Sequence, residues 1–159
     1  QVSAAFGRLE KFKAGDKAVC LILVKNPSGF NEVLRLLRSD VHPKSLVLAL
    51  NDKIADGRDV SWIWDVDMEG CWQGTGFVVA AGVRAHDMAL RLKYAGLAEG
   101  DPPTPRLAVE RDVFKAFRMA LEATPPAGTL YVLPTYTAML ELREALAHAG
   151  HLKPYWRES

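Results

Sequence analysis

Two stretches of the sequence bring together residue types that could do chemistry, and the shorter one surrounds a lysine. Residues 25–29 read "KNPSG", after an apolar run and before a helical pattern. Lys25 would project near the positive end of the following helix, where a phosphate or another anion can bind. Asn26 is a capping residue type, and Pro27 suits a turn or the first helical position. A well-capped turn with a solvated lysine fits the same residues, so both interpretations remain open.

The second stretch, residues 51–70, combines acidic side chains with two tryptophans. An aspartate can hold a catalytic histidine in one tautomer, including a histidine that belongs to a partner protein. Exposed tryptophans such as Trp62 and Trp64 would suit a protein interface. In the alternative interpretation, the tryptophans pack into the core and the acids face water. The acidic residues are Asp52, Asp56, Asp59, Asp65, Asp67 and Glu69.

Alternating apolar and amphipathic runs predict the elements that position these stretches. The predicted strands cover residues 5–12, 18–25, 45–51, 76–82, 106–110 and 129–136. The predicted helices cover residues 29–40, 84–96, 112–123 and 137–150. This order indicates an α/β, Rossmann-like fold with a mainly parallel sheet of five or six strands and helices on both faces.

Ligands of such sheets bind beyond the carboxyl ends of the strands. Three segments follow predicted strands and carry the polar residues of interest, namely residues 24–29, 48–67 and 132–138. We therefore expect these segments to lie along one rim of the sheet.

The overall composition limits the class of protein. Lys and Arg number 20 against 19 Asp and Glu, a formal net charge of +1, which gives no general case for a nucleic-acid partner. Cys20 and Cys71 lack the spacing of a metal site, so we expect no metal and two reduced thiols in a cytoplasmic protein. No common motif of a self-sufficient catalytic centre is present, and a first residue of Gln rather than Met suggests a piece of a longer protein.

The sequence resembles the C-terminal domain of the Mur ligase family. "GRLE" at residues 7–10 and "KNP" at residues 25–27 are similar to the start of that domain, although most members have His-Asn-Pro where this chain has Lys25. Three longer segments, residues 46–70, 82–97 and 130–146, resemble the MurT branch of the family more than any other.

The resemblance implies a function for the full-length protein. MurT-type subunits pair with GatD, a class-I glutamine amidotransferase with a cysteine nucleophile, which releases ammonia from glutamine. The MurT subunit uses ATP and Mg²⁺ to activate the α-carboxylate of the D-glutamate in the stem peptide of lipid II, and ammonia then amidates it. The complex is a carbon–nitrogen ligase that acts at the membrane surface during peptidoglycan synthesis.

The resemblance also implies that residues 1–159 form a single domain, without the N-terminal and ATP-binding middle domains. The nucleotide loop and the zinc ribbon of those domains are absent from the sequence. We therefore expect the isolated domain to be inactive and to hold no cofactor itself.

Site residues follow from the position of the matching motifs. By position in "SWIWDVD", Asp65 would complete the Cys-His-Asp triad of the glutaminase, with Asp59 and Asp67 as alternatives. The side chains expected to face the nucleotide are Arg8, Lys25 and Asn26, and those expected at the partner interface are Trp62 and Trp64. A non-catalytic, Rossmann-like interaction domain is the alternative function.

Overall fold

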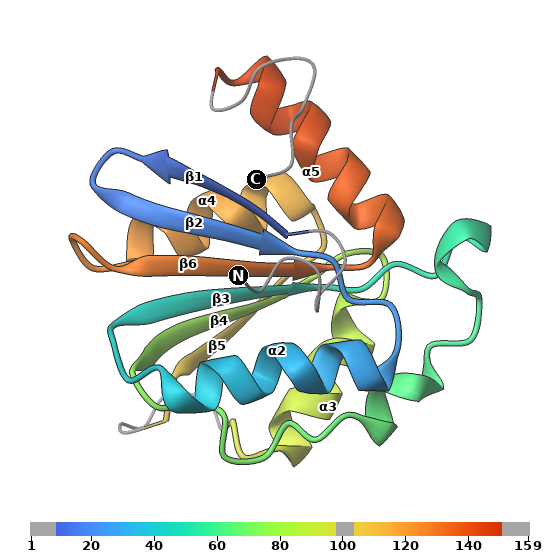
Figure 1. The fold of residues 1–159 in the computed structure, drawn as a ribbon. Helices are drawn as coiled ribbons and strands as arrows, with labels where there is room; N and C mark the ends of the chain where they lie inside the picture. Colours follow the sequence, from blue (N-terminus) through green and yellow to red (C-terminus); the bar gives the residue numbers. More distant parts are fainter. Residues whose placement is uncertain (1–8, 98–103, 151–159) are drawn as a thin grey trace.

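The computed structural model describes residues 9–97 and 104–150, which form a sheet between two layers of helices (Figure 1). The strand order is β1-β2-β6-β3-β4-β5, with β1 antiparallel to β2 and the other neighbours parallel. The predicted fold class and the predicted mainly parallel sheet are confirmed. The strands are β1 (Leu9–Ala14), β2 (Lys17–Ile22), β3 (Lys44–Ala49), β4 (Thr75–Ala81), β5 (Arg106–Glu110) and β6 (Thr129–Pro134).

Burial explains which runs form the central strands. Every residue of β3 is buried, and β6 is buried from Leu130 onward. Strands that are covered on both faces read as continuous apolar runs, as the sequence predicted. The edge strand β1 instead alternates between exposed and partly buried side chains after its first two residues.

Helices cover both faces of the sheet (Figure 1). One apolar core lies under α2 (Pro27–Ser39) and α3 (Ala85–Tyr94). The other lies under α4 (Val113–Ala123) and α5 (Tyr136–His148). All four helices were expected from the periodicity of the sequence, which places apolar residues on one side of each helix.

The connection from β3 to β4 contains no α-helix, and the structure describes it throughout. It carries two short 3₁₀-helices, η1 (Ile54–Asp56) and η2 (Ser61–Asp65). Because β3 and β4 are parallel, this loop must run from the carboxyl end of one strand back to the amino end of the other. It does so along α2 and α3, and η2 contacts both helices.

This path corrects one expectation. Residues 24–29 and 132–138 lie at the carboxyl rim of the sheet, as predicted, and so does the start of the loop at Asn51. From Ser61 onward, however, the loop leaves the rim and follows the α2/α3 layer. The prediction that residues 48–67 lie entirely along the rim is therefore wrong, because this loop also has to return the chain to the amino end of β4.

A close backbone approach fixes the turn after β4. Gly82 has φ +92°, and a Cβ atom there would lie 2.4 Å from the Leu50 carbonyl oxygen. In the same turn, the Arg84 N–H donates to the Leu50 carbonyl at 2.9 Å. The end of β3 and the start of α3 are thereby held against each other.

We expect Gly82→Ala to destabilise the chain more than Gly57→Ala, which serves as the matched control. Gly57 has the same φ of +92°, but a Cβ there would meet nothing within 4 Å. Backbone strain alone costs about 1–3 kcal/mol, and the clash with Leu50 adds roughly 1–3 kcal/mol. Urea denaturation of both variants measures the difference, and equal losses would show that the close approach is unimportant.

Candidate functional site

Asn51 joins the carboxyl ends of three strands at the rim. Its buried side chain accepts a hydrogen bond from the Val83 N–H at 2.9 Å and donates to the Thr137 hydroxyl at 2.9 Å. Its backbone N–H donates to the Thr135 hydroxyl oxygen at 2.9 Å. The loop therefore leaves β3 in a fixed direction.

Asp56 caps a helix that begins 80 residues later in the chain. Its carboxylate accepts from the Thr137 N–H at 2.8 Å and from the Thr137 hydroxyl at 2.5 Å, in the first turn of α5. The Lys53 N–H also donates to it, at 3.1 Å. The hydroxyl of Thr135, the residue just before α5, accepts from the Asn51 N–H and makes no cap bond to the helix. Asp56 therefore has a structural role, since it links the loop after β3 to the start of α5.

The predicted "KNP" turn lies at the rim beside β6. The Val24 N–H donates to the Pro134 carbonyl at 3.0 Å, and the Asn26 side chain accepts from the Gly29 N–H at 2.8 Å. Asn26 is therefore the cap of α2, as one of the two interpretations required. Lys25 is exposed, and within the described part of the chain it makes no hydrogen bond or ion pair. Arg8 lies outside the described residues, so its predicted role remains a prediction.

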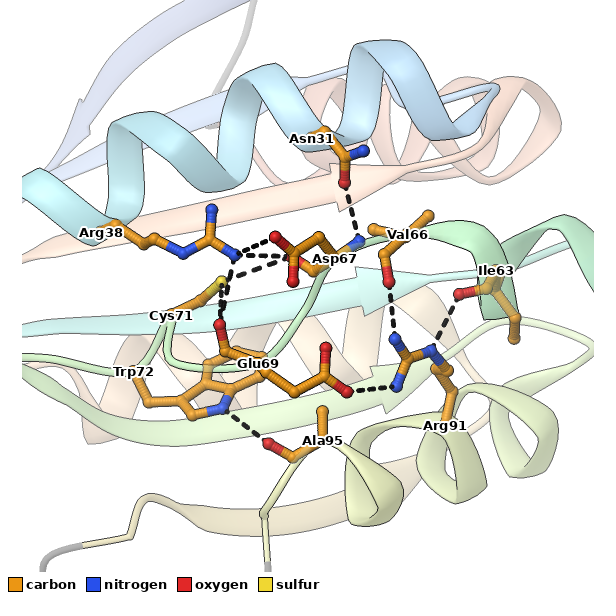
Figure 2. A network of polar contacts seen from close by, with 10 residues as sticks. All are labelled: Asn31, Arg38, Ile63, Val66, Asp67, Glu69, Cys71, Trp72, Arg91 and Ala95. Carbon is orange, nitrogen blue, oxygen red and sulfur yellow. Dashed lines mark hydrogen bonds and ion pairs between the residues drawn. The ribbon is translucent and has the colours of Figure 1, made fainter.

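We call residues 63–69 the acidic segment, and two side chains of α2 hold it from one side (Figure 2). The Asn31 side chain accepts from the Asp67 N–H at 2.8 Å. Arg38 donates to the carbonyl oxygens of Asp67 at 2.9 Å and Glu69 at 3.2 Å, and it lies 3.1 Å from the Asp67 carboxylate. Residues 67–69 are thereby fixed against α2.

Arg91 of α3 holds the same segment from the other side (Figure 2). Its guanidinium donates to the Ile63 carbonyl at 2.9 Å and to the Val66 carbonyl at 2.6 Å. It also lies 3.4 Å from the Glu69 carboxylate, and only 5% of its side chain is exposed. A buried charge is tolerated when its donors are satisfied in this way.

The three candidate aspartates differ in what their carboxylates do. Asp59 accepts from the Ser61 N–H at 2.9 Å, and this bond lowers the pKa of the Asp59 carboxyl below its usual value. Asp67 is paired with Arg38. Asp65, the last residue of η2, is exposed, and among residues 9–97 and 104–150 it has no hydrogen-bond or ion-pair partner. Of the three, Asp65 is the carboxylate left available to another molecule.

The two tryptophans have different environments. Trp62 is partly buried and packs on Phe30, with ring centroids 6.2 Å apart. Trp64 is 44% exposed, and its ring meets Tyr94 edge-on at 5.4 Å. Tyr94 and Leu90, four residues apart on α3, are also exposed. We call Trp64, Leu90 and Tyr94 the apolar patch, and one of its members, Trp64, directly precedes Asp65 in the chain.

The two cysteines lie in the interior of the protein. Cys20 and Cys71 are free and buried, and burial raises the pKa of each thiol to about 11. None of the described helices has the length and apolar character that a membrane crossing requires. In the described ranges, no three His, Cys, Asp or Glu side chains group together as metal ligands.

Sequence reasoning missed the residues that organise the segment, above all Arg91. A signal was available, because Arg91 falls on the same side of its helix as the apolar residues Met88, Leu92 and Ala95. A charged residue at a core position indicates a buried network. Arg38, in contrast, lies in the last turn of α2, where a basic residue is ordinary.

Comparison with known proteins places this site in a family. A family model described as "MurT ligase C-terminal" matches residues 23–139, which include the acidic segment, α3 and the start of α5. The chain belongs to the MurT ligase C-terminal family. The recognition of this branch of the Mur ligases from the sequence is therefore confirmed.

Curated MurT relatives support the same assignment over most of the chain. The MurT subunit of lipid II isoglutaminyl synthase (glutamine-hydrolyzing) from Streptococcus pneumoniae is 40% identical over 91% of this chain. The subunit of the same name from Staphylococcus aureus is 37% identical over 88% of this chain. The chain spans only 31% and 30% of the lengths of these two relatives.

A solved structure supports the fold at low sequence identity. A UDP-N-acetylmuramoyl-L-alanyl-D-glutamate–2,6-diaminopimelate ligase superimposes with a TM-score of 0.55 at 13% identity, covering 92% of this chain and 32% of that chain. The MurT domain thus shares the architecture of a Mur ligase segment.

We expect Arg38→Met to loosen the acidic segment of this MurT domain, because its carbonyl groups lose their donor. Amide hydrogen exchange in residues 66–71 should accelerate by about tenfold or more. Arg35→Met is the control on the same helix, because the ion pair of Arg35 with Glu32 lies at the exposed surface, where such a pair contributes about 0–1 kcal/mol. Equal exchange in the two variants would argue against the tether.

Proposed function

We propose that this chain is the C-terminal domain of the MurT-type subunit of a glutamine-dependent, ATP-consuming lipid II isoglutaminyl synthase. The full complex would amidate the α-carboxylate of the D-glutamate in the stem peptide, in the cytoplasm at the membrane surface. The names of the curated relatives support this reaction, and the chain covers about the share of them that one domain would. In this proposal the domain is inactive by itself, because the N-terminal and ATP-binding middle domains lie elsewhere in the full protein.

The second part of the proposal is that the domain docks a GatD-like, class-I glutaminase through the apolar patch. Trp64 and Tyr94 are 44% and 71% exposed, and aromatic residues of this kind are common anchors at interfaces. Trp62, which is partly buried on Phe30, would support the patch from below.

The observation that carries the proposed role of the domain is the state of Asp65. It is exposed and directly follows Trp64 of the apolar patch, whereas Asp59 and Asp67 are already engaged by Ser61 and Arg38. In the proposed complex its carboxylate accepts a hydrogen bond from the histidine of the glutaminase. It thereby orients the imidazole and stabilises the imidazolium that forms when the imidazole takes the proton of the cysteine thiol, and the resulting thiolate attacks the amide of glutamine. Glutamine hydrolysis would then depend on assembly, which limits the wasteful release of ammonia.

The third part of the proposal concerns the nucleotide. ATP with Mg²⁺ would be bound mostly by the middle domain and would supply the phosphoryl group that activates the substrate carboxylate. Lys25 fits this role from the C-terminal domain, because its ammonium group is exposed at the rim beside the start of α2. The Asn26 side chain caps the helix, so it would shape the turn that presents Lys25. Arg8 is proposed to face the nucleotide on the basis of the resemblance alone.

The alternative function is a non-catalytic interaction domain on the same fold. Fold similarity cannot separate the two functions, because related folds host many activities. The apolar patch would serve either one. The behaviour of Asp65 discriminates between them, since only the catalytic role requires its carboxylate.

We expect Asp65→Asn in the full-length protein, mixed with its glutaminase, to reduce glutamate release by about 10²–10⁴-fold, as loss of a triad carboxylate does. Binding of the two subunits, measured by calorimetry, should be unchanged, since the substitution keeps the shape of the side chain. Asp59→Asn and Asp67→Asn are the matched controls and should retain most of the activity. If the loss followed Asp67 or Asp59 instead, the assignment would move to that residue, and full activity of all three variants would favour the non-catalytic function.

We expect Lys25→Ala to slow the ATP-dependent step by about 10²–10³-fold, the usual effect of removing one donor to a developing negative charge. Phosphate release and amidated lipid II are the readouts, and glutamine hydrolysis should be unaffected. Lys13→Ala, an exposed lysine on β1, is the control. Unchanged ATP turnover in the Lys25 variant would remove this role.

A further inference from the structure

We infer that Arg91 is the positioning residue for Asp65, which extends the function proposed above and rests on it. The two carbonyl groups that Arg91 binds belong to Ile63 and Val66. These residues lie on either side of the dipeptide Trp64-Asp65. One guanidinium therefore holds both ends of the short piece of backbone that presents the carboxylate.

The segment has little internal structure to hold its shape without Arg91. η2 is a 3₁₀-helix of five residues, and such helices have weak hydrogen-bond geometry. The bond that ends it, from the Val66 N–H to the Ile63 carbonyl, is 3.4 Å long. The two bonds from Arg91, at 2.9 Å and 2.6 Å, are shorter and come from a charged donor.

Arg91 also connects the carboxylate to the apolar patch. Its guanidinium lies 5.3 Å from the centre of the Trp64 ring, and the same ring contacts Tyr94. The buried charge therefore supports both the residue proposed to act on the histidine and the residue proposed to bind the partner. Displacement of the guanidinium would move Asp65 and Trp64 together.

The fork geometry of arginine is required for this role. The guanidinium presents its donors in one plane and in fixed directions, so Nε and Nη2 can bind two different carbonyl groups at once. A lysine would keep the positive charge and could reach the carbonyl groups only through a single nitrogen. Arg91→Lys thus keeps the positive charge and removes the two separate nitrogens that bind the carbonyl groups of Ile63 and Val66.

The test is a double-mutant cycle in the full-length protein with its glutaminase. Arg91→Lys should lower kcat for glutamine hydrolysis by about tenfold or more and leave KM for glutamine unchanged, because glutamine binds in the partner. At a saturating concentration of the glutaminase, which offsets any weaker docking through Trp64, Arg91→Lys should cause no further loss in the Asp65→Asn background, since there is no carboxylate left to position. Arg106→Lys is the control, because Arg106 also stacks on a ring, that of Phe77 on β4, away from this segment.

The outcomes separate this inference from the proposed function. If Asp65→Asn keeps full glutaminase activity, the proposed function of Asp65 fails. If Asp65→Asn is inactive and Arg91→Lys has no effect, or reduces the residual activity by the same factor in both backgrounds, only the positioning role fails.

A second measurement covers a variant that assembles poorly. Amide hydrogen exchange in the full-length protein should accelerate in residues 61–67 of Arg91→Lys and remain unchanged in β4. Unchanged exchange in residues 61–67 would overturn the inference even if the activity had fallen.

Discussion

A chain segment that joins two adjacent parallel strands without an α-helix has no helical hydrogen bonds of its own. Its buried backbone carbonyl groups therefore need donors from other elements of the fold. Between β3 and β4 this requirement is met by two arginines, Arg38 of α2 and Arg91 of α3, which donate to four carbonyl groups of residues 63–69. The loop can therefore lie against the helical layer with an irregular path. The positions of Asp65, Asp67 and Glu69 depend on these two side chains.

The acidic residues of the loop differ in the groups that they bind. Asp56 is committed to the start of α5, Asp67 to Arg38, and Asp59 to the turn before η2. Asp52 and Glu69 pair with Arg84 and Arg91. Of the acids in residues 51–70, Asp65 is the one that has no hydrogen-bond or ion-pair partner among the residues that the structure describes. The sequence favoured Asp65 only by its position in the matching motif, and the structure adds that Asp59 and Asp67 have partners of their own.

The layers of the fold could be predicted from the sequence. Burial on both faces makes a parallel strand apolar throughout, and apolar residues recur every three to four positions in an amphipathic helix. The cap at Asn26 was also readable, since capping depends on neighbours in the chain. The path of residues 61–69 was not predictable, because it is set by Asn31, Arg38 and Arg91, which are distant in sequence. For the same reason the cap of α5 was not predictable, because it is supplied by the carboxylate of Asp56, 80 residues earlier in the chain.

The strand order carries a consequence for synthesis of the protein. β6 lies between β2 and β3, so the strand in the middle of the sheet is the last of the described strands to leave the ribosome. Until Thr129–Pro134 has emerged, β2 and β3 have no common neighbour, and the carboxylate of Asp56 has no helix to cap. The nascent chain must therefore keep two partly formed apolar edges apart from each other and from other chains, and native topology can close only in a late, long-range step.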